Sequence, residues 1–124
     1  MKIIDAHSHI FPQKIAEKAT EAISRFYEDI EMGHMGCSEE LLKAGSEAGV
    51  EKYLVFSTAT VPEQVRSIND FIMSEAAIHE EFIPLGTMHR DFDDFEEEIE
   101  RDGKTFRRFS PISAEEAEKI INTL

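Results

Sequence analysis

Two histidines and an aspartate stand at alternate positions near the start of the chain, as Asp5, His7 and His9. The alternating hydropathy of residues 2–10 predicts a β-strand, which ends before Pro12 because proline cannot continue a ladder. Side chains two residues apart share a strand face, so we expect the three to project together. The neighbouring apolar residues indicate a buried strand, where ionisable groups are costly unless paired or metal-bound. The spacing therefore predicts His7 and His9 as ligands of a divalent metal.

The alternative interpretation of the His-x-His pair is a solvated strand end without a ligand. The other histidines are weaker candidates for metal binding or catalysis. His34 and Cys37 lie in a glycine-punctuated loop at residues 31–37, at a spacing that suits a metal, but two isolated candidates do not make a site. We interpret this loop as a mobile segment near the mouth of a site. His79, near the end of a predicted helix, is expected to interact with the last carbonyls of that helix.

The rest of the chain is predicted to be a frame of alternating helices and strands. Apolar residues recur at helical spacing in four segments, and two further apolar runs are typical of strands. The expected helices cover residues 13–30, 38–49, 63–79 and 92–102, and the further strands cover residues 51–58 and 82–88. Ser38 is the expected N-cap of the second helix, and Gly49 the glycine that ends it. This alternation predicts one α/β domain over residues 1–124, with a parallel sheet of three or four strands and flanking helices.

Composition excludes several classes of partner. The 124 residues include 26 acidic and 13 basic ones, a formal charge of −13. Such a surface repels phosphate backbones and anionic lipids, so we expect neither nucleic acid nor membrane as a partner. Cys37 is the single cysteine, which excludes an intrachain disulfide and fits a reducing cytoplasm. The first residues lack a basic region followed by an apolar segment, so no signal peptide is expected.

Residues 4–12 (Ile-Asp-Ala-His-Ser-His-Ile-Phe-Pro) resemble the first-strand signature of the metal-dependent amidohydrolase superfamily. The closest branch contains aminocarboxymuconate-semialdehyde decarboxylase and related hydrolases. Residues 84–91 (Pro-Leu-Gly-Thr-Met-His-Arg-Asp) are similar to the third strand of that branch. The resemblance implies a (β/α)8 barrel in which His7 and His9 bind a catalytic zinc or similar ion. It also implies that His89 approaches the substrate or supports a ligand, although Arg90 stands where relatives often carry proline. Asp5, His89 and Asp91 are candidates to complete the site, with His89 and Asp91 as the candidate catalytic residues.

The chain is short for such a barrel. A complete (β/α)8 barrel typically needs about 250 residues. Where the family continues into a glycine-rich fourth strand, residues 104–110 fit a poor strand or a loop, and a capping box from Ser113 to Glu116 opens an expected last helix. In the family, a histidine from a middle strand and an aspartate after the last strand complete the ligand set. Neither strand is present, so the resemblance implies a partial barrel with half a metal site.

Three functional hypotheses follow. In the first, the chain assembles with itself or a second chain into a metal-dependent hydrolase of an amide, ester or lactone, or into a decarboxylase. In the second, it is a truncated, non-catalytic remnant that acts as an oligomeric or metal-binding module. Open sheet edges and apolar strand faces favour association, so we expect a homodimer or higher oligomer. The third, an unrelated open sheet such as a flavodoxin-like module, lacks a glycine-rich phosphate loop after the first strand.

Overall fold

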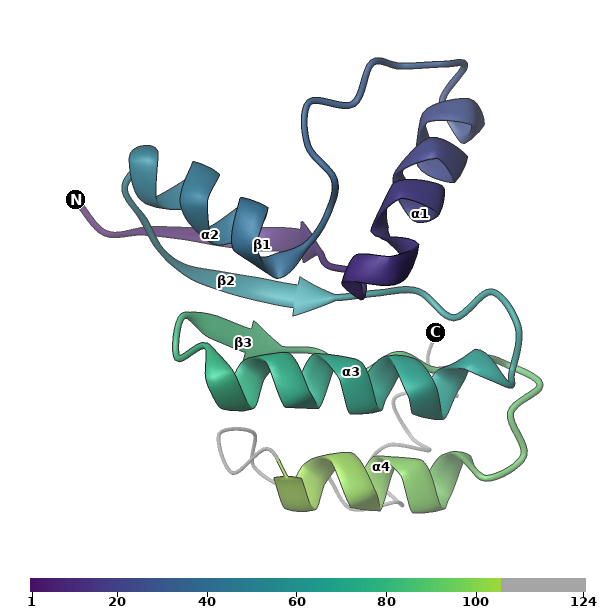
Figure 1. Ribbon diagram of the computed structural model, residues 1–124. Helices are drawn as coiled ribbons and strands as arrows, with labels where there is room; N and C mark the ends of the chain where they lie inside the picture. The colour runs from purple at the N-terminus through teal and green to yellow at the C-terminus, as the bar shows by residue number, and fades with distance from the viewer. Residues whose placement is uncertain (106–124) are drawn as a thin grey trace.

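A computed structural model of the chain describes residues 1–105 and contains strands and helices in the predicted order (Figure 1). The elements are β1 (Ile3–His9), α1 (Gln13–Phe26), α2 (Ser38–Glu47), β2 (Val50–Phe56), α3 (Gln64–Ile78), β3 (Phe82–Pro84) and α4 (Phe95–Thr105). The prediction of an α/β fold with a parallel sheet and flanking helices is confirmed. The expected helix at residues 113–124 and most of the segment 104–110 lie outside the described residues.

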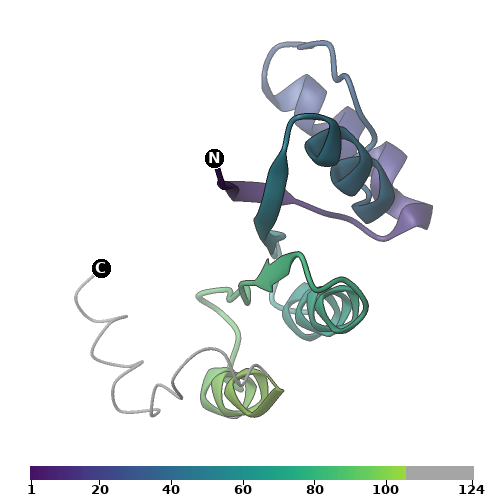
Figure 2. The ribbon, with the colours of Figure 1, turned by 90° about the vertical axis from the view of Figure 1, so that its left-hand side faces the viewer.

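The three strands form one parallel sheet in the order β1-β2-β3. Right-handed crossovers between strands in sequential order place the connecting helices on the same side of a sheet. Figure 2 shows α1, α2 and α3 on one side of the strands. The sheet therefore has a helix-covered face and a second face on which none of the described helices packs.

The core lies between the sheet and the helices α2 and α3. Its fully buried residues are Ile10, Tyr53, Val55, Ile72 and Phe82. Burying each such side chain stabilises the fold by about 1.5–3 kcal/mol. The rings of Tyr53 and Phe82 meet edge to face, with centroids 6.0 Å apart.

A glycine allows α2 to lie this close to the sheet. A Cβ atom added at Gly45 would stand 1.8 Å from the hydroxyl oxygen of Tyr53, so no larger residue fits without moving a core ring. The turn after α2 uses a second glycine, as predicted, because Gly49 has a φ of 79°.

The largest differences from the predicted element ends are at α1 and β3, which each end four residues early. Helix α1 stops at Phe26, because Glu28 and Asp29 adopt left-handed φ angles of 61° and 60°. Strand β3 stops at Pro84 rather than residue 88. Beyond Pro84, the backbone N–H of Leu85 still donates to the Val55 carbonyl on β2, whereas the backbone N–H of Thr87 donates to Asn69 Oδ1 on α3 at 2.7 Å.

The expected N-cap of α2 is also displaced by one residue. Ser38 is the first helical residue and Cys37 occupies the cap position. The Ser38 hydroxyl makes no cap hydrogen bond and donates to the carboxylate of Glu75 on α3. The serine therefore joins two helices instead of capping one.

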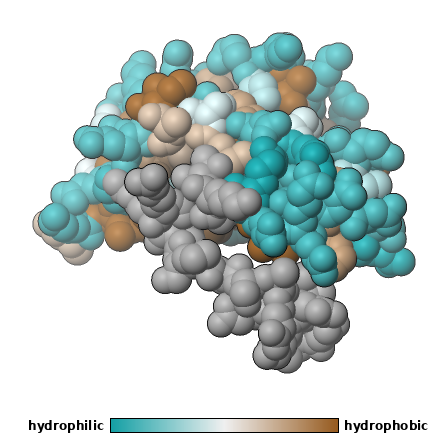
Figure 3. Space-filling view, turned by 90° about the horizontal axis from the view of Figure 1, so that it is seen from below, coloured by the Kyte–Doolittle hydropathy of each residue, from teal (hydrophilic) through white to brown (hydrophobic). Residues whose placement is uncertain are grey.

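Helix α4 packs on α3 through charged groups. Glu98 is 0% exposed and accepts hydrogen bonds from Asn69 at 2.9 Å and from Arg101 at 3.0 Å. Viewed from the α4 side, the described surface is mainly hydrophilic (Figure 3). No helix within residues 1–105 combines the length and the apolar character that crossing a bilayer requires.

Candidate metal centre

The two predicted ligands meet at the carboxyl end of β1. The Nε2 atoms of His7 and His9 are 3.2 Å apart, and their ring centroids are 5.0 Å apart. Phe56 on β2 contacts both rings, with centroid distances of 4.9 Å to His7 and 4.4 Å to His9. The prediction that the two histidines share a strand face is confirmed, and a neighbouring strand restricts the orientation of both rings.

The expectation of a buried strand is wrong for the described residues. β1 is an edge strand, since β2 is the one strand hydrogen-bonded to it in residues 1–105. His7 is exposed and His9 is half-buried. Burial, and to a smaller extent the neighbouring charge of His7, holds the pKa of His9 below its ordinary value and so favours the neutral form of the ring. A neutral imidazole is the form that binds a metal.

Asp5 does not share the histidine face as predicted. The register pairs Asp5 with Tyr53, whose side chain is buried on the helix-covered side, whereas His9 pairs with Phe56. An irregularity between Asp5 and Ser8 inserts an extra residue into β1 and reverses the alternation of side chains. The Asp5 carboxylate instead accepts the backbone N–H of His7 at 3.0 Å. It therefore holds the backbone at His7 and does not lie with the two imidazoles.

The separation of the two nitrogens suits a shared metal ion. Zinc binds imidazole nitrogen at about 2.0–2.1 Å in tetrahedral sites, so two ligands on one ion lie about 3.3 Å apart. Without a metal, the same distance fits an N–H···N hydrogen bond between one protonated and one unprotonated nitrogen. In the described part of the chain, no group of three or more histidine, cysteine, aspartate or glutamate side chains is arranged to hold a metal. The separation of the pair is thus compatible both with two positions of a zinc site and with a hydrogen bond.

The two candidate catalytic residues contact each other. The backbone N–H of Asp91 donates to Nδ1 of His89 at 3.2 Å, and the Asp91 carboxylate lies 3.9 Å from that nitrogen. Within residues 1–101, no hydrogen bond, ion pair or ring contact joins either of them to His7 or His9. They remain candidates, placed at the carboxyl end of β3 as the histidine pair is at the carboxyl end of β1.

His34 and Cys37, the second candidate pair of metal ligands, lie in different surroundings. His34 lies 3.5 Å from the carboxylate of Glu40, and most of its side chain is exposed. Cys37 is 5% exposed and free. These two residues are not brought together as ligands in the described structure.

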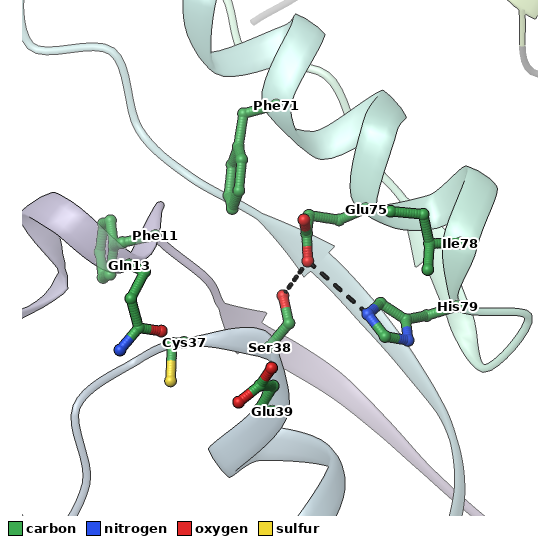
Figure 4. Close-up of a pocket in the computed structure, with 9 residues that line it drawn as sticks. All are labelled: Phe11, Gln13, Cys37, Ser38, Glu39, Phe71, Glu75, Ile78 and His79. Atoms are coloured by element: carbon green, nitrogen blue, oxygen red, sulfur yellow. Dashed lines mark hydrogen bonds and ion pairs between the residues drawn. The ribbon is translucent and has the colours of Figure 1, made fainter.

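Sequence reasoning missed a pocket on the helix-covered side of the sheet (Figure 4). Its volume is about 370 Å³. It is lined by Phe11, Gln13, Cys37, Ser38, Glu39, Phe71, Glu75, Ile78 and His79. Glu75 lies between two of these groups, since one carboxylate oxygen accepts the Ser38 hydroxyl and lies 3.8 Å from Nε2 of His79. The His79 ring thus contacts a carboxylate one turn back, not the last carbonyls as expected.

The order of these groups is wrong for a serine nucleophile. A catalytic triad needs the imidazole between serine and carboxylate, so that the ring removes the hydroxyl proton. Here the carboxylate separates the serine from the histidine. Glu75 and His79 lie four residues apart on one helix, and this spacing in the sequence could have predicted their contact. The arrangement links α2 to α3 and leaves the histidine pair of β1 as the candidate centre.

Comparison of the chain with protein-family models, with curated proteins and with solved structures finds no match. The resemblance of residues 4–12 and 84–91 to amidohydrolases is a prediction from the sequence that these comparisons do not test.

Proposed function

We propose that this chain is an amidohydrolase-like protein with a partial (β/α)8 architecture, in which His7 and His9 bind a divalent metal ion, zinc in the first place. The observation that carries the proposal is the 3.2 Å separation of the two Nε2 atoms on one strand face. When bound, such an ion supplies a Lewis acid for a water and a carbonyl group. The substrate class is an amide, ester or lactone, with decarboxylation as the variant.

The arrangement of the sheet supports this proposal. Sequential parallel strands with helices on one side are the local pattern of a (β/α)8 barrel, in which chemistry takes place at the carboxyl ends of the strands. His9 is the last residue of β1, and His89 follows β3 at the same end of the sheet. Phe56 packs on both ligand rings and limits their rotation, so the chain holds the pair ready for a metal.

A second candidate function is a non-catalytic metal-binding module. It is favoured by the lack of a third ligand near the pair among the described side chains. A catalytic zinc site normally has three protein ligands and an open position, whereas two ligands hold the ion weakly. Hydrolysis thus requires further ligands from outside residues 1–101 of one chain.

Metal titration tests the proposal. The metal-stripped full chain is titrated with zinc by calorimetry, and the bound metal is quantified after gel filtration. We expect His7→Ala and His9→Ala each to weaken binding at least tenfold, because each removes one of two chelating nitrogens. His34→Ala is the matched control, since His34 is exposed and pairs with Glu40 away from β1. Unchanged zinc affinity in both β1 variants overturns the proposal.

Turnover separates the two candidate functions. The zinc-loaded chain is assayed against a panel of aryl esters, lactones and amides. Hydrolysis that disappears in His9→Ala but persists in His34→Ala supports the hydrolase. Metal binding without hydrolysis across the panel supports the module.

A further inference from the structure

The side of the sheet away from the helices carries a continuous set of apolar residues, here called the open face. It comprises Ile4, Leu54, Phe56 and Ile83, and it includes the rings of His7 and His9. The register places these side chains together, since Leu54 pairs with Ile83 and His9 pairs with Phe56. Ile4 is 57% exposed, although isoleucine is normally buried.

The open face is nearly free of charge, in contrast to the chain as a whole. Across the alternation of β2 it includes one charged residue, Lys52, whose Nζ donates to the carbonyl of Glu80 at 2.7 Å. The whole chain has a formal charge of −13, so two copies repel each other across most other surfaces. Two open faces can meet without bringing acidic groups together, so a second copy of this chain meets no charge repulsion at this face.

A twofold axis through the open face would also bring four histidine nitrogens together. In an isologous dimer the same patch lies on both sides of the axis, so a pair of ligands near the axis becomes a set of four. The Nε2 separation of 3.2 Å in one copy matches one edge of a tetrahedral site. Two such edges, crossed about the axis, give the four nitrogens of a tetrahedron.

We propose that two copies of the chain associate through their open faces and that His7 and His9 of each copy together hold one divalent metal ion. The inference rests on the metal binding proposed above and specifies its partner and stoichiometry. Imidazole ligands suit zinc, copper and nickel. An ion with four protein ligands has no open position for water, so this complex is a structural metal link and favours the module over the hydrolase.

Stoichiometry and mass distinguish this inference from the proposed function. Zinc is added to the metal-stripped full chain, and the complex is analysed by light scattering and metal quantification. The inference predicts a dimer that forms on metal addition, holds one zinc per two chains and dissociates with a chelator. A monomer with one zinc per chain overturns the inference and leaves the proposed function intact. A chain that binds no zinc overturns both.

A pair of matched variants tests the interface without touching the ligands. Ile4→Glu places a charge on the open face, whereas Ile78→Glu places the same charge on the helix-covered side, where Ile78 is 73% exposed. Both sites are exposed, so both variants are expected to fold. We expect Ile4→Glu to weaken the zinc-linked dimer at least tenfold and Ile78→Glu to leave it unchanged. Equal dimerisation of the two variants contradicts the proposed interface.

Discussion

Two polar clusters of this molecule differ in how completely their groups are satisfied. The cluster between α3 and α4 buries Glu98 and surrounds it with donors, since Asn69 and Arg101 hydrogen-bond to it and Arg66 lies 3.8 Å away. Arg101 also pairs with Asp70. The cluster at the end of β1 consists of two imidazoles that contact each other and an aromatic ring.

The difference separates a structural role from a binding role. A buried charge with complementary partners holds two helices together and leaves no atom for a ligand. Two histidine nitrogens that converge in partly exposed positions, without a carboxylate partner in residues 1–101, gain little for the fold and remain available. The comparison predicts that the first cluster controls stability and the second controls metal binding.

The largest expected effect is the loss of Glu98. Replacing it with alanine leaves Arg101 and Asn69 without their shared acceptor and opens a void, and we expect a loss of about 2–4 kcal/mol in the free energy of unfolding. Denaturant unfolding monitored by circular dichroism gives the value. Glu97→Ala is the control, because the Glu97 side chain is 68% exposed and its pair with Arg66 is expected to contribute less than about 1 kcal/mol. Equal stability of the two variants contradicts the structural role of the cluster.

Added zinc is expected to stabilise the folded chain through the cluster at the end of β1 and not through the cluster around Glu98. At a zinc concentration 100 times the dissociation constant, binding to the folded state adds about 2.7 kcal/mol of stability in the one-site approximation. Wild type and Glu97→Ala should both show this gain in thermal unfolding. His7→Ala and His9→Ala should lose it. A full zinc-dependent gain in either histidine variant shows that the stabilising ion binds elsewhere.

A third expectation concerns acid stability. Burial by itself raises the pKa of Glu98, but hydrogen bonds from Arg101 and Asn69 and the charges of Arg101 and Arg66 outweigh it, so the pKa lies below the ordinary value. A lowered folded-state pKa contributes stability that is complete above the unfolded-state pKa and is lost as the pH falls through the folded-state pKa. The stability difference between wild type and Glu98→Gln should therefore be constant near neutral pH and shrink in acid. Urea unfolding from about pH 7 down to about pH 2 tests this, and a difference independent of pH contradicts it.

Most of the fold could be predicted because the periods of its hydrophobic residues are local. The apolar run around Tyr53 and Val55 and the helical stripes of α1 and α3 were sufficient to predict the parallel α/β order. The ends of the helices and strands were harder to predict, because they depend on contacts between residues distant in sequence. Just beyond β3, for example, the backbone N–H of Thr87 donates to Asn69, which lies 18 residues earlier in the chain.

The candidate site was predicted in part for a similar reason. The spacing of His7 and His9 placed them together correctly, because the alternation of a strand depends on neighbouring residues alone. Asp5 was misplaced, since an irregularity in β1 leaves no clear signal in composition. Ser38 and Glu75, which both line the pocket, are 37 positions apart in the sequence. No local sequence pattern could therefore predict the pocket.

The smallest expected effect is that of removing His7 from the metal-free chain. In metal-free solution, His7→Ala should change the free energy of unfolding by less than about 0.5 kcal/mol, because an exposed side chain contributes little packing. The accompanying change in zinc affinity is expected to be at least tenfold. Unfolding with a chelator present measures the first quantity, and calorimetry measures the second. If removal of His7 instead destabilises the metal-free chain as strongly as removal of Glu98, the imidazole pair is part of the framework of the fold, and its convergent nitrogens need no metal to explain them.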